Sequence, residues 1–142
     1  MLLTPISKHL DLGLLLIRIV LGGMFMVYGA PKLFGGPDAW QPLGAAMGNF
    51  HITFWPAFWG FMAAFSMFVG GICLIAGLLT RVFCLFLLIT MIVATSVHLG
   101  NGEGLLGAGH AIEDGAVFLG LLIIGPGRYS LDAWLNSIVR LV

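Results

Sequence analysis

The sequence predicts an all-α membrane protein, a transmembrane four-helix bundle formed by one domain over residues 1–142. Hydrophobic residues make up 60% of the chain and charged residues 8%, whereas soluble domains are about one quarter charged. This number of charged side chains is too small to cover a surface that faces water, so much of the surface must face lipid. The net charge is zero, and the six Lys and Arg residues are scattered, which excludes a nucleic-acid-binding surface.

Four apolar segments each approach the roughly 20 residues that cross a bilayer. They cover approximately residues 12–28, 54–79, 82–99 and 108–124. Backbone groups inside lipid must bond to one another, so these segments are predicted to be helices. The short break at Thr80 and Arg81 predicts a tight antiparallel hairpin between the second and third spans. Cys73 and Cys84 lie in apolar runs without a CxxC spacing, which is typical of core residues rather than of a redox dithiol.

The basic residues predict the orientation of the bundle. If the N-terminus is cytoplasmic, that side carries Lys8, Arg81, Arg128 and Arg140, and the opposite side carries only Lys32. This bias follows the positive-inside rule. Both termini are therefore predicted to be cytoplasmic, in a multi-pass membrane protein.

Two further segments are expected at the membrane surface. Gly35 to His51 is long for a simple loop, and we expect a short interfacial or re-entrant piece there, whose role the sequence leaves open. Ser130 is a good N-cap for an amphipathic C-terminal helix over residues 131–142, which we expect to lie in the inner interface. Its polar stripe consists of Asp132, Asn136 and Arg140.

Ionisable residues interrupt the first and last spans. An unpaired charge near the centre of a span costs about 2.5–3.5 kcal/mol on insertion scales. Arg18 and Glu113 are expected about 6–8 Å apart along the membrane normal, given the helical rise. We therefore predict a buried Arg18–Glu113 ion pair, with Asp114 as the alternative partner for Arg18. In the competing interpretation, Arg18 reaches the inner headgroups and the acids reach the outer water.

A polar pocket is predicted in the outer half of the bundle. His110 is three and four residues from Glu113 and Asp114, so it shares a helix face with either acid. There His110 or Asp114 would exchange protons with a small bound molecule, which makes them the candidate catalytic residues. The predicted pocket consists of Tyr28, Lys32, His98, His110 and Asp114.

A metal site is the weaker interpretation of the same residues. His98, His110 and one acid are ligand types that suit Zn, Fe or Mn. No HExxH-type spacing accompanies them, and the two histidines belong to different helix ends. Histidines that cap helix ends explain the pattern equally simply, so we predict neither a metal nor a haem.

Three segments resemble the DoxX family of bacterial membrane proteins. Leu16 to Gly36 resembles the family's first helix, with its internal Arg and its Gly-x-x-Lys end: LIRIVLGGMFMVYGAPKLFGG. Gly77 to Arg81, GLLTR, resembles the turn between helices two and three. Gly125 to Trp134, GPGRYSLDAW, resembles the exit from helix four, and Glu113 corresponds to the acid upstream of it. Together the segments span nearly the whole chain in the family's order.

The resemblance implies a four-helix bundle in the bacterial inner (plasma) membrane. It also implies an oxidoreductase subunit, because the family includes subunits related to thiosulfate:quinone oxidoreductase. The implied ligand is a quinone or a small sulfur or phenolic compound, and a redox protein is the implied partner. Two departures matter for proton and quinone chemistry. Tyr28 stands where family members often have His, and the usual acid of helix two is missing between Phe61 and Cys73.

Three functional hypotheses follow. The leading one is the membrane component of a quinone-linked redox system, with a pocket that opens outward. The second is a non-catalytic protein that carries a small molecule or tethers a soluble partner. The third is a structural bundle that forms homo-oligomers through small residues on its helix faces.

Overall fold

The computed structural model describes residues 7–139, and every regular element in this range is helical. The elements are α1 (Ser7–Phe34), α2 (Pro37–Ala45), the 3-10 helix η1 (Ala46–Phe50), α3 (Pro56–Ala76), α4 (Thr80–Gly100), α5 (Gly104–Ile124) and α6 (Leu131–Val139). Four of them are long and apolar enough to cross a membrane: residues 9–34 of α1, and the whole of α3, α4 and α5. The predicted four-helix membrane bundle is confirmed.

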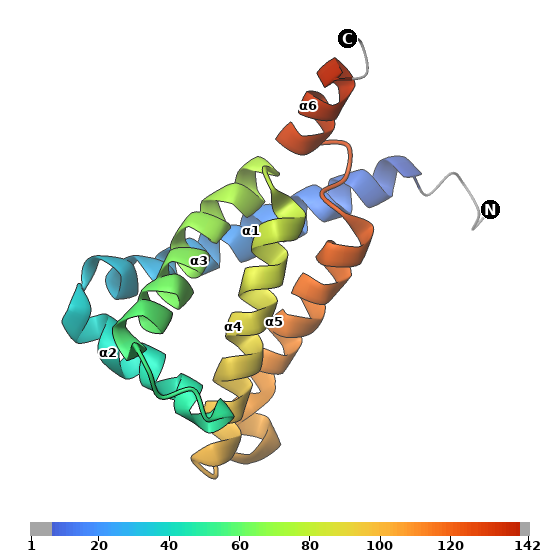
Figure 1. Ribbon diagram of the computed structural model, residues 1–142. Helices are drawn as coiled ribbons and strands as arrows, with labels where there is room; N and C mark the ends of the chain where they lie inside the picture. The colour runs from blue at the N-terminus through green and yellow to red at the C-terminus, as the bar shows by residue number, and fades with distance from the viewer. Residues whose placement is uncertain (1–6, 140–142) are drawn as a thin grey trace.

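The four long helices form two antiparallel pairs, α1 with α3 and α4 with α5, joined through the α3–α4 hairpin (Figure 1). The start of α1 and the helix α6 lie at one end of the bundle, which we call the termini end; the opposite end is the loop end. The core contains Phe25 of α1, Leu74 of α3, Leu87 of α4 and Phe118 of α5. The rings of Phe25 and Phe118 meet edge to face, with their centroids 4.9 Å apart.

The segment Gly35 to His51 forms α2 and η1, which pack across α3 at the loop end. Glycine allows this close approach. A Cβ atom on Gly44 would collide with the carbonyl of Pro56, and one on Gly60 would collide with the carbonyl of Trp40. The two backbones therefore touch directly, and α2 is fixed to α3.

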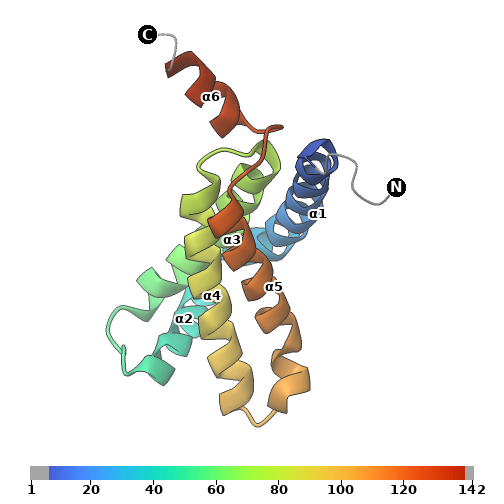
Figure 2. The same cartoon turned by 90° about the vertical axis from the view of Figure 1, so that its right-hand side faces the viewer.

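The C-terminal helix begins as predicted and then leaves the bundle. The Ser130 hydroxyl accepts a hydrogen bond from Ala133 N–H at 3.1 Å, so Ser130 caps α6. The helix projects away from the other helices (Figure 2) and has no buried residue. Asp132, a member of the predicted polar stripe, points toward the start of α4. Arg140, another member of the stripe, lies outside the described residues.

Candidate functional site

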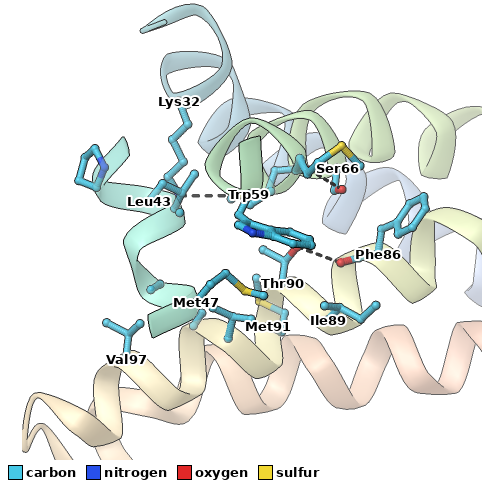
Figure 3. Close-up of a pocket in the computed structure, with 18 of the residues that line it drawn as sticks. Lys32, Leu43, Met47, Trp59, Ser66, Phe86, Ile89, Thr90, Met91 and Val97 are labelled. Carbon is cyan, nitrogen blue, oxygen red and sulfur yellow. Dashed lines mark hydrogen bonds between the residues drawn. The ribbon is translucent and has the colours of Figure 1, made fainter. Parts of the chain in front are cut away.

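A cavity of about 550 Å³ lies between α3, α4 and the α2–η1 segment in the loop-end half of the bundle (Figure 3). This volume is typical of small-molecule sites. The cavity exists because α3 and α4 separate as they leave their shared turn at Gly77. The η1 helix spans the gap at the loop end, where the Asn49 amide donates to the Ser96 hydroxyl of α4 at 3.3 Å.

One face of α3 forms the first wall. Trp59, Met62 and Ser66 recur at helical spacing and line the cavity. The indole N–H of Trp59 donates to the Phe54 carbonyl at 3.0 Å, which fixes the ring against the cavity. Met91 and Thr90 of α4 form the facing wall. The lining is therefore mostly apolar, with a small number of polar groups.

The polar groups differ in what they offer a ligand. The Ser66 hydroxyl donates to the Met62 carbonyl at 2.6 Å, and the Thr90 hydroxyl donates to the Phe86 carbonyl at 2.9 Å. Because their protons are engaged within the helices, both hydroxyls present acceptor lone pairs to the cavity. Lys32 of α1 offers donors instead, and its ammonium lies 3.7 Å from the Met67 sulfur.

His98 lies at the loop end of the cavity and belongs to a polar cluster outside it. Its Nδ1 is 2.7 Å from the Glu103 carboxylate, and the Asn101 amide donates to the same carboxylate at 3.3 Å. These hydrogen bonds, first that of His98, lower the pKa of Glu103. The carboxylate contact on Nδ1 holds the His98 ring in place. It leaves the other ring nitrogen free for a ligand.

The side of the cavity between α3 and α4 faces the bilayer. Its rim includes Phe58, Phe86 and Ile89, which are exposed apolar side chains on spanning helices. On helices long and apolar enough to cross a membrane, exposed side chains of this kind are expected to face hydrocarbon, where water is scarce. The opening therefore gives access to molecules dissolved in the membrane.

The structure does not form the predicted ion pair between Arg18 and Glu113. Arg18 is only 1% exposed, and its guanidinium donates to backbone carbonyls at the termini end. The acceptors are the carbonyls of Leu74 (3.1 Å), Ile75 (3.5 Å), Tyr129 (2.8 Å) and Pro126. Arg18 therefore joins the end of α3 to the segment after α5.

The reason for the difference is the axial position of Arg18. The guanidinium binds the carbonyl of Pro126, which follows α5, whereas Glu113 lies 12 residues before Gly125, or about 18 Å along the helix. The prediction counted Arg18 as about 9 Å inside the span, whereas the carbonyls of Leu74 and Pro126 that it binds place it level with the ends of α3 and α5. A long side chain also points back toward the N-terminus of its own helix. Arg18 thus meets the loop carbonyls and not the acid.

The remaining predicted pocket residues divide into two groups. Lys32 and His98 line the cavity. Tyr28, His110 and Asp114 do not line it: Tyr28 and His110 are exposed, and Asp114 is half-buried on α5. Within residues 7–139 no group of three or more metal-ligating side chains occurs.

Sequence reasoning missed the cavity walls, including Trp59, Ser66 and Thr90. A signal was present, because Ser66 and Thr90 are isolated hydroxyl residues inside apolar spans. Such residues mark a face turned to protein or to a ligand rather than to lipid. The glycine contacts that place α2 over the cavity carry no comparable signal.

These features define a multi-pass helical membrane protein with a laterally open, mostly apolar cavity. The DoxX family model matches residues 13–99, which is more than half of the chain, and the chain belongs to the DoxX family. It is similar to the inner membrane protein YqjF of Escherichia coli (strain K12), with 33% identity over 135 residues, covering 92% of this chain and 98% of the relative. No solved structure matches the chain. It is thus a small multi-pass inner-membrane protein.

Proposed function

We propose that this protein binds a lipophilic ring compound of the quinone class in the cavity between α3, α4 and the α2–η1 segment. In this role it serves as the membrane component of a redox system. The observation that carries the proposal is the cavity itself, which is large, mostly apolar and open to the bilayer. Quinones reside in the bilayer, so a lateral opening suits them.

The polar groups of the cavity match both redox forms of such a ring. The carbonyl oxygens of a quinone need donors, which Lys32 and His98 supply. The hydroxyl groups of the quinol need acceptors, which Ser66 and Thr90 supply. Reduction of the ring consumes two electrons and two protons; a soluble redox protein would supply the electrons. His98 would deliver protons, because His110 and Asp114 lie outside this cavity.

Binding is tested with the purified protein in lipid nanodiscs and a short-chain ubiquinone, measured by quenching of Trp59 fluorescence. Trp59→Phe should remove most of the quenching. Ala94→Phe, which fills the cavity, should weaken binding at least about tenfold, or about 1.4 kcal/mol. Val20→Phe, on the exposed face of α1, is the matched control and should leave binding unchanged. Equal affinity in Ala94→Phe and Val20→Phe would contradict the proposed site.

The redox role is tested separately in membranes. Deletion of the gene should change the quinol fraction of the membrane pool under steady respiration. His98→Ala should reproduce the deletion, while quinone binding in nanodiscs weakens by no more than about tenfold, the loss of one hydrogen bond. A deletion without effect on the quinol fraction would rule out the redox role.

A non-catalytic carrier is the second candidate, and the lateral opening favours it equally. A cavity that opens to the bilayer can shelter a lipophilic molecule without chemistry. A carrier predicts saturable binding that Ala94→Phe weakens and a quinol fraction that does not respond to deletion. The two measurements above therefore separate the two functions.

A further inference from the structure

The cavity contains a cation but no acid. Among the described residues that line it, Lys32 is the only Lys, Arg, Asp or Glu, and His98 is the only other ionisable side chain. The one salt bridge within residues 7–139 joins His98 to Glu103, so no described acid pairs with Lys32. Asp38, the nearest acid along the chain, is exposed on α2 and does not line the cavity. A cation in apolar surroundings is unfavourable unless an opposite charge accompanies it.

The ammonium group of Lys32 points into the protein. Lysines near the ends of spanning helices usually extend to the membrane interface, but Lys32 reaches inward from the last turn of α1 (Figure 3). Its contact there is the sulfur of Met67, a buried residue of α3, at 3.7 Å. Sulfur is a weak acceptor, and the carbonyl end of α1 contributes only about half a negative charge. Neither of them supplies a full counterion.

Aromatic side chains form much of the wall around this cation. The Trp59 ring is held by the bond from its N–H to the Phe54 carbonyl. Phe58 packs edge to face against Trp59, with the ring centroids 5.2 Å apart, and Phe86 lines the cavity from α4. Aromatic side chains pack favourably on the faces and edges of other rings. A flat ring therefore fits these walls better than an acyl chain does.

We propose that the ligand is a lipophilic ring compound with an ionised acidic oxygen, and that this oxygen pairs with Lys32. The inference rests on the proposed quinone-class function and narrows it to ring compounds that carry a negative charge. A hydroxyl group on a quinone ring is acidic, because the ring carbonyls delocalise the charge of its anion. Such an anion would form a charge-assisted hydrogen bond with the ammonium group. A carboxylate on an acyl chain offers the same charge, and the experiment distinguishes the two.

A matched pair of ligands isolates the effect of the charge. 2-Hydroxy-1,4-naphthoquinone is an anion at neutral pH, and 2-methoxy-1,4-naphthoquinone has the same ring without the charge. Calorimetry in nanodiscs gives the ratio of their two dissociation constants. The unaltered protein should prefer the anion at least about tenfold more strongly than Lys32→Met does. Comparing the two proteins cancels the unequal partitioning of the compounds into lipid.

Two control variants separate the charge of Lys32 from other effects. Lys32→Arg keeps the positive charge and should keep a preference for the anion. Arg81→Met removes an exposed cation outside the cavity and should leave the preference unchanged. Measurable binding of the methoxy compound to Lys32→Met shows that its cavity is intact.

The charge of the bound compound is also measured directly, without any variant. The ionised hydroxynaphthoquinone has a visible absorption band, which should persist when the compound binds the unaltered protein. Without a cation, transfer to an apolar site would favour the neutral form. Loss of the band on binding would overturn the proposal.

The other outcomes separate this proposal from the one on which it rests. Equal preference in the unaltered protein and in Lys32→Met would overturn the anionic ligand and leave the quinone-class function intact. Dodecanoate is the acyl-chain probe. If its binding depends on Lys32 and that of the hydroxynaphthoquinone does not, the ligand is an acyl anion and the ring assignment is wrong. Absence of binding by both naphthoquinones would contradict the quinone-class function itself.

Discussion

The two ends of the bundle are built on different principles. At the termini end, hydrogen bonds between side chains and backbone join α1, α3, α4 and α6: Arg18 donates to carbonyls, and Asp132 accepts from N–H groups. At the loop end the helices separate around a cavity, and α2 is fixed by the glycine contacts with α3. The first arrangement fixes the architecture, and the second leaves space for a ligand.

The termini end should therefore be the larger contributor to stability. Arg18→Met removes the donor of the Pro126 and Tyr129 carbonyls, and hydrogen bonds to a charged group contribute about 1.5–3 kcal/mol each. We expect a loss of at least about 3 kcal/mol in the free energy of unfolding, measured by denaturant titration in detergent. Arg81→Met is the control, because Arg81 is exposed and makes one long bond of 3.4 Å to the Ile123 carbonyl.

At the loop end, glycine replaces hydrogen bonding as the source of close packing. Gly60→Ala places a Cβ atom against the Trp40 carbonyl, which should detach α2 and cost about 1–3 kcal/mol. Gly23→Ala is the matched control, because a Cβ atom there meets nothing within 4 Å. Protease sensitivity of the α2–η1 segment measures the detachment. Equal sensitivity of the two variants would show that α2 is held by other contacts.

Asp132 should contribute less than either feature. Its carboxylate accepts hydrogen bonds from Leu79 N–H at 2.8 Å and Thr80 N–H at 3.0 Å, and so satisfies the free donors at the start of α4. Asp132→Ala should destabilise the protein by about 1–2 kcal/mol, as the loss of an N-terminal cap does. Asn136→Ala, on the exposed part of α6, should leave the unfolding midpoint unchanged.

The smallest effect concerns pH at the loop end. The pKa of Glu103 is lowered, first by the hydrogen bond from His98. A lowered pKa in the folded state means that this contact stabilises the protein above the pKa of the unfolded chain. The contribution is lost as the pH falls through the folded-state pKa. His98→Ala should raise the pKa of Glu103, measured by carboxyl NMR titration, whereas an unchanged value would contradict the contact.

How far the sequence predicts the structure differs between the same two ends. The spans and the α6 cap follow from apolar runs and from Ser130, because these signals are local. The partners of Arg18 do not, since they are backbone carbonyls 56 to 111 residues away. The sequence shows that a buried Arg needs acceptors, but it does not distinguish an acid from a loop carbonyl.

The cavity was predictable only in part. Lys32 and His98 were identified because charged residues stand out at helix ends. The opposite wall was missed, because Trp59 and Met62 look like ordinary members of an apolar helix. Their arrangement depends on the angle between α3 and α4, and that angle follows from tertiary packing rather than from local pattern.

The lateral opening of the cavity also determines the concentration that a ligand must reach. For a molecule that enters through the hydrocarbon region, the concentration that governs binding is its ratio to lipid molecules, not its concentration in water. Occupancy by the proposed ligand would therefore track its mole fraction in the membrane. A strongly partitioning compound fills such a site at a trace level in the surrounding medium, and dilution with extra lipid empties it.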